Sequence, residues 1–133
     1  MINLTIERMV PLLCVHDVRQ SIAFYRDILG FELKGTYPDD SDDPGFATFE
    51  RSDVRLMVNS DEDPSERTDA TDIQRSHDIT LYLWTKDLDS LRASLLGHQV
   101  DVGDVEVQHY GMKQLPVSDP DGFKLVFQEG VKK

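Results

Sequence analysis

Apolar residues in the first half of the chain follow first a strand pattern and then a helix pattern. A nearly continuous apolar run over residues 9–15 predicts a buried strand, and Asp17 behind it is typical of a helix N-cap. Apolar side chains then recur at helical spacing as far as Gly30, which predicts a helix with one buried face. Turn-rich segments separate further predicted strands at residues 31–34, 46–50 and 54–58. The first half therefore has the order β-α-β-β-β.

The same order of elements begins again in the second half. Residues 79–84 predict a strand, Asp87 is a second N-cap, and leucines at helical spacing predict a helix that ends before Gly97. The extended segments predicted after this helix lie at residues 100–102, 105–110, 113–117 and 123–127. A repeat of so small a unit indicates that two units share one buried surface, because neither covers its own sheet well.

Length and composition favour one globular domain. The chain has 133 residues, of which 39% are hydrophobic and 29% charged, and domains usually have about 100–150 residues. We therefore expect a single domain over residues 1–133. Within it we place repeat one at about 8–59, an acidic linker at about 60–78 and repeat two at about 79–129.

The charge balance limits the classes of partner. With 25 acidic and 14 basic residues the formal net charge is −11, which repels nucleic-acid phosphates and anionic lipid head groups. We therefore expect no nucleic-acid and no membrane binding. No apolar run has the length of a membrane span, and residues 1–7 lack a signal-peptide pattern, so we expect a cytoplasmic protein. The single cysteine, Cys14, lies in an apolar strand, which predicts a buried, inert thiol.

Several motifs resemble those of one known family. They are Val15-His16-Asp17-Val18, the run from Ser21 to Leu33 with its Phe-Tyr pair, and Gly111-Met112 followed by the run from Val117 to the turn Asp119-Pro120-Asp121-Gly122. Together they closely resemble the vicinal oxygen chelate superfamily, which contains glyoxalase I, bleomycin-resistance proteins, fosfomycin-resistance enzymes and extradiol dioxygenases. The resemblance implies an α+β fold: two βαβββ repeats form a curved mixed sheet around a cleft, with the helices on the outer face. It does not decide the reaction, because this fold carries several chemistries and some members only bind.

The resemblance also implies places for metal ligands. Enzymes of the family hold a divalent metal in the cup, with His, Gln or Glu ligands on the first and last strands of each half. Counted from the helix-opening aspartates and from the Asp-Pro-Asp-Gly turn, these places fall on Val10, Met57, Thr80 and Val126. None of the four is a usual ligand, whereas a catalytic metal takes about three His, carboxylate or thiolate ligands. We therefore expect no metal, no other cofactor and no catalytic residues.

The same strand positions would instead line an apolar and aromatic pocket. Strand alternation places Val10 and Leu12 on one inner face, and Thr80, Tyr82 and Trp84 on its counterpart. An alternative for the two aromatic residues is core packing or a dimer interface. The predicted ligand-binding residues are Val10, Leu12, Met57, Asn59, Thr80, Tyr82, Trp84, His109, Tyr110, Val126 and Gln128.

We therefore predict a metal-free small-molecule-binding protein of the glyoxalase/bleomycin-resistance type. It would be a homodimer that sequesters an amphipathic or cationic drug-like ligand, and the negative net charge suits a cation. The alternative is an enzyme, a lyase, isomerase or dioxygenase of the same superfamily with a non-standard metal site. Such a site would draw on His77 and His109, with a carboxylate such as Asp78 or Glu106.

Overall fold

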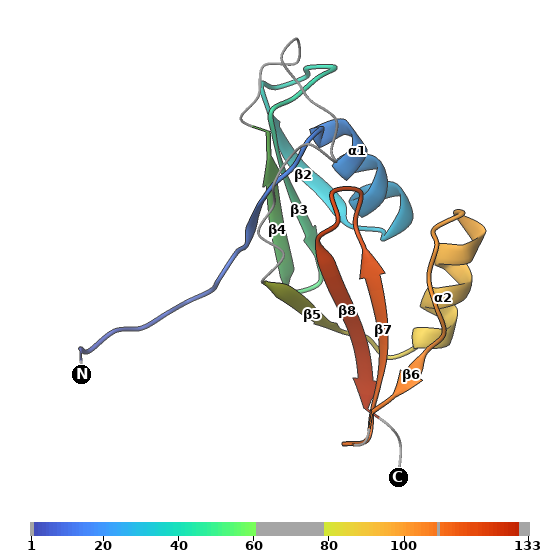
Figure 1. The fold of residues 1–133 in the computed structure, drawn as a ribbon. Helices are drawn as coiled ribbons and strands as arrows, with labels where there is room; N and C mark the ends of the chain where they lie inside the picture. The colour runs from blue at the N-terminus through green and yellow to red at the C-terminus, as the bar shows by residue number, and fades with distance from the viewer. Residues whose placement is uncertain (1, 61–78, 109, 131–133) are drawn as a thin grey trace.

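A computed structural model describes residues 2–60, 79–108 and 110–130 of the chain (Figure 1). The predicted linker therefore lies almost entirely outside the described residues. The first repeat comprises β1 (Leu12–Cys14), α1 (Val18–Ile22), the π-helical η1 (Ala23–Ile28), β2 (Glu32–Tyr37), β3 (Phe46–Arg51) and β4 (Val54–Asn59). The second repeat comprises β5 (Thr80–Trp84), α2 (Leu88–Gly97), β6 (Glu106–Val107), β7 (Met112–Ser118) and β8 (Lys124–Gly130).

Each repeat forms its own four-stranded mixed sheet among the described residues, in the order β1-β4-β3-β2 and β5-β8-β7-β6. The first strand of each repeat runs parallel to the last, and the other neighbours are antiparallel. The matching strand orders confirm the predicted α+β fold of two βαβββ repeats. The mixed sheet is divided in two because, in the part of the chain described, β1 pairs only with β4 and β5 only with β8.

The helices begin where the sequence predicts and cover one face of each sheet. Asp17 accepts the backbone N–H of Arg19 at the start of α1, and Asp87 accepts that of Ser90 in α2. After η1 the chain leaves the helix at Gly30, whose φ of 78° glycine adopts without strain. Helix α1 contacts β3 and β4, and α2 contacts β7 and β8. We call the opposite side of each sheet its free face. No helix in the described part of the chain has the length and apolarity to cross a bilayer.

The inward faces of both sheets contribute to one hydrophobic core. Its large side chains come from both repeats, so the repeats share a buried surface, as the small repeated unit indicates. The largest of the fully buried side chains are those of Tyr25, Phe49, Leu88, Leu95, Leu115 and Leu125.

A buried hydrogen bond ties the first repeat to the second. The Tyr25 hydroxyl donates to Asp119 Oδ2 at 2.8 Å, and the two residues are 1% and 5% exposed. The other oxygen of Asp119 accepts the backbone N–H groups of Asp121 and Phe123. Burial raises the pKa of Asp119, and the hydrogen bonds that its carboxylate accepts oppose this rise. The aromatic motif and the Asp-Pro-Asp-Gly turn therefore join the two repeats.

Several details differ from the sequence predictions. Residues 100–102 form no strand, because the Val100 N–H bonds to the carbonyl of Leu95 and the segment closes the end of α2. Strand β1 is shorter than predicted, because residues 2–11 form an extended segment outside the strand, which we call the N-terminal arm (Figure 1). Its base stays on the protein, where the Pro11 carbonyl accepts the backbone N–H of Met57, and its first residues run away from it. Cys14 is exposed rather than buried, since β1 turns Leu13 inward and its neighbours outward.

Candidate functional site

The predicted ligand residues of the second repeat lie together on the free face of the β5–β8 sheet. Tyr82 pairs with Val126 and Trp84 with Gln128 across the parallel strands, and Thr80 points to the same side. Val126 is 4% exposed and Gln128 9%, whereas Tyr82 is 56% and Trp84 69% exposed. This face therefore has a buried floor beside two aromatic side chains that reach solvent.

Gln114 adds a second amide to this floor. It pairs with Gln128 across antiparallel β7 and β8, and its Nε2 donates to Gln128 Oε1 at 3.2 Å. The same nitrogen donates to the hydroxyl of Tyr110 at 2.6 Å, which brings the predicted rim residue Tyr110 to this face. Gln114 is not among the predicted ligand-binding residues, although its alternation with Met112 and Pro116 along β7 is a signal that could have placed it there.

The predicted residues of the first repeat lie on the free face of the other sheet. Leu12 pairs with Met57 and Cys14 with Asn59 across parallel β1 and β4. Leu12 is exposed, and Met57 and Asn59 are half-buried. The structure thus gathers the predicted residues into two groups, one on each sheet. His109 lies outside the described residues.

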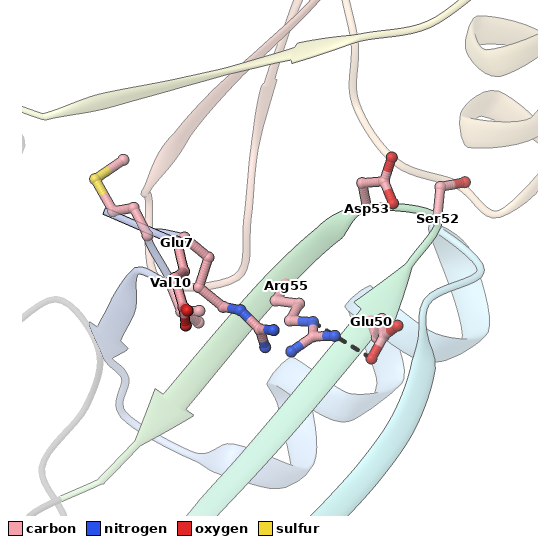
Figure 2. A pocket seen from close by; sticks show the side chains of 8 residues that line it. Glu7, Val10, Glu50, Ser52, Asp53 and Arg55 are labelled. Atoms are coloured by element: carbon pink, nitrogen blue, oxygen red, sulfur yellow. Dashed lines mark ion pairs between the residues drawn. The ribbon is translucent and has the colours of Figure 1, made fainter. Parts of the chain in front are cut away.

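Val10 lies at the base of the N-terminal arm. It lines a cavity of about 250 Å³ with Glu50, Asp53 and Arg55, residues of the β3–β4 hairpin (Figure 2). Arg55 Nε lies 3.6 Å from Glu50 Oε2, and Arg55 shares its side of β4 with Met57. The charged side chains around Val10 are therefore of both signs, with Glu7, Glu50 and Asp53 beside Arg8 and Arg55.

A larger, mainly apolar cavity of about 390 Å³ opens between the two repeats. Thr80 and Tyr82 of β5 line one side, and Leu56 of β4 and Pro11 of the arm line the other. It lies beside the first half of β4. There the edge of β4 that faces β1 has no strand partner, because the pairing of β1 with β4 covers only Met57–Asn59. Its volume is in the range of small-molecule pockets, about 300–1,000 Å³. Thr80 and Tyr82 are the predicted ligand-binding residues among those that line it.

Comparison with known families decides the identity of the fold. The sequence model of the Glyoxalase/Bleomycin resistance protein/Dioxygenase superfamily matches residues 5–127. The chain belongs to this superfamily. The resemblance found in the sequence motifs is thereby confirmed. A search of curated proteins finds no match.

Solved structures of this superfamily's fold include an antibiotic binding protein, a resistance determinant and a lyase. TnmS3, an antibiotic binding protein from Streptomyces sp. CB03234, superposes with a TM-score of 0.72 at 21% identity, over 96% of this chain and 99% of its own. The bleomycin resistance determinant encoded on the transposon Tn5 has a TM-score of 0.67 at 20% identity, over 94% and 98%. Lactoylglutathione lyase from Agrobacterium tumefaciens has a TM-score of 0.68 at 20% identity, over 93% of both chains. The fold alone therefore does not choose between binding and catalysis.

The described part of the chain was compared with the ligand sets of metal centres. Among the described residues, no three His, Cys, Asp or Glu side chains gather as a group that could hold a metal ion. Glu106 is exposed on β6. The other residues of the alternative site, His77, Asp78 and His109, lie outside the described part of the chain.

Proposed function

We propose that this protein binds an amphipathic, cationic small molecule without a metal and holds it on the free face of the β5–β8 sheet. The observation that carries the proposal is the pair Tyr82 and Trp84, which are 56% and 69% exposed side by side on that face. Neighbouring exposed aromatic side chains are typical of a binding surface, since they stack on planar rings and attract cations. The net charge of −11 raises the local concentration of a cationic ligand.

Two further observations support binding rather than chemistry. The four counted metal positions carry Val10, Met57, Thr80 and Val126, and none of these side chains is a usual metal ligand. Two structures of the same fold are described as an antibiotic binding protein and a bleomycin resistance determinant. A protein that sequesters its ligand needs a complementary surface and no catalytic group. The alternative, a lyase, isomerase or dioxygenase with a non-standard metal site, requires a metal for its function.

We also propose that the protein is a homodimer whose N-terminal arm packs on a second copy. The arm runs away from the body of its own chain (Figure 1). Its alternate residues Ile2, Leu4 and Ile6 are 79%, 63% and 76% exposed. An extended segment with one apolar side gains stability when a partner covers that side. A cytoplasmic location stays a prediction from the sequence.

Replacing Trp84 with alanine is expected to weaken the binding of proflavine, a planar aromatic cation, by about 10- to 100-fold. The exposed indole provides the largest stacking surface on the free face, and alanine removes it. Isothermal titration calorimetry of wild-type and variant protein measures the change in the dissociation constant.

Leu96→Ala is the matched control for this experiment. Leu96 is an exposed apolar residue as well, at 45%, but it lies on α2 rather than on the free face. Its substitution is expected to change the proflavine affinity by less than about twofold. Equal binding by wild type and Trp84→Ala, or no binding of proflavine and bleomycin by the wild type, would contradict the proposed site.

A further inference from the structure

A single row of side chains crosses the free face of the β5–β8 sheet. Trp84 lies opposite Gln128, Gln128 opposite Gln114, and Gln114 opposite Glu106. Directly paired residues of neighbouring strands point to the same side of a sheet, so all four side chains belong to this face. The row begins with an aromatic ring, continues with two amides and ends with a carboxylate.

The two amides form one hydrogen-bonding unit in the floor. Gln114 and Gln128 are 8% and 9% exposed, and Gln114 uses both hydrogens of its Nε2 on Tyr110 and on Gln128. In the described part of the chain, Gln114 Oε1 and Gln128 Nε2 have no hydrogen-bond partner, and neither atom is sealed from solvent. The pair therefore presents one acceptor and one donor, at the two outer ends of the hydrogen-bonded amides.

We infer that this row selects ligands in which a secondary amide lies between an aromatic ring and a cation. The inference rests on the proposed function and names the chemical class of its ligand. The ligand carbonyl would accept from Gln128 Nε2, and the ligand N–H would donate to Gln114 Oε1. This complementary pairing uses both outward atoms of the glutamine pair.

The two ends of the row fit the two ends of such a ligand. Strands lie about 4.8 Å apart, so about 14 Å separates the backbones of β5 and β6, with the amides between them. At one end the indole of Trp84, 69% exposed, stacks on a planar ring. At the other end Glu106 is an exposed carboxylate that attracts a cation. The order aromatic, amide, cation is therefore fixed by the order of the strands.

An amide N–H is the group that this site distinguishes best. A site with an acceptor in a mostly buried floor discriminates against a ligand that brings no donor, because that acceptor loses its contact with water and gains no partner. An ester has the same carbonyl as an amide but an oxygen in place of the N–H. Procainamide and procaine differ only in this atom, and both join an aromatic ring to a tertiary ammonium group.

Calorimetric titration with these two compounds tests the inference. We expect the wild type to bind procainamide about tenfold more tightly than procaine. Gln114→Met, which removes the acceptor, is expected to bring this ratio close to unity. Gln128→Met removes the donor to the carbonyl and is expected to weaken both compounds alike. Glu106→Gln is expected to weaken both by a few-fold at low salt, with less effect at high salt.

Gln20→Met is the matched control, because Gln20 is exposed on α1 and the tenfold ratio should persist there. Thermal unfolding of each variant shows whether it is folded. Proflavine carries a planar cationic ring and no amide, so it tests binding at the free face separately from the selection of an amide. Equal affinities for the two compounds, or binding of neither, while proflavine still binds, would overturn the amide inference alone. If the wild type does not bind proflavine, the proposed function is overturned as well.

Discussion

Replacing Asp119 with alanine is expected to lower the free energy of unfolding by about 4 kcal/mol, a large part of the roughly 5–15 kcal/mol that stabilises a domain. The Asp119 carboxylate accepts hydrogen bonds from the Tyr25 hydroxyl and from the backbone N–H groups of Asp121 and Phe123. Alanine leaves these donors without their acceptor, and a hydrogen bond to a charged group contributes about 1.5–3 kcal/mol. Chemical denaturation followed by circular dichroism measures the loss.

Tyrosine variants show whether the loss comes from the link between the repeats. Tyr25→Phe removes one of these hydrogen bonds and is expected to cost about 2 kcal/mol, and in the double variant the two costs should add incompletely. Tyr37→Phe also removes a hydroxyl, but Tyr37 is 71% exposed, so a change below about 0.5 kcal/mol is expected. An Asp119→Ala variant as stable as the wild type would show that this turn does not hold the repeats together.

Glutamate at both Leu4 and Ile6 is expected to convert the proposed dimer into monomers. These side chains are 63% and 76% exposed in the single chain and would be buried against the second copy. A buried carboxylate without a partner costs several kcal/mol, so the dimer dissociation constant should rise by more than about 100-fold. Light scattering after gel filtration should show the mass fall from twice 15.2 kDa to 15.2 kDa per particle.

The opposite side of the arm provides the matched control. Glutamate at Asn3 and Thr5 adds the same charge to the same segment, but on the side that alternation turns away from the apolar residues. This variant is expected to stay dimeric. Equal dissociation of the two variants would mean that net charge, and not the apolar side of the arm, controls assembly. A monomeric wild type would contradict the proposed dimer directly.

Strand alternation allowed the sequence to predict which side chains share a face. Tyr82 and Trp84 lie on the same side of their sheet as Val126 and Gln128, as the spacing of two residues indicates. The N-caps Asp17 and Asp87 could also be predicted from the sequence, because a capping side chain acts on backbone groups within a few residues. The ligand-binding role of the predicted residues stays a prediction.

Features that depend on strand pairing could not be predicted from local pattern. Gln114 lies beside Gln128 only because β7 and β8 pair in one particular register, which short-range periodicity does not specify. The apolar character of Val100 and Val102 indicated a strand, but these residues pack against the core from a segment without a strand partner among the described residues. Cys14 was predicted to be buried because its strand is apolar throughout. It lies instead on the free face of its sheet and is exposed.

Trp84 fluorescence tests whether the free face of the β5–β8 sheet binds its ligand without a metal. Trp84 is the only tryptophan of the chain, so its emission reports on this face. We predict saturable quenching by proflavine, with the same dissociation constant in the presence and in the absence of EDTA. Emission that proflavine leaves unchanged, or binding that EDTA abolishes and a divalent metal restores, would contradict metal-free binding at this face.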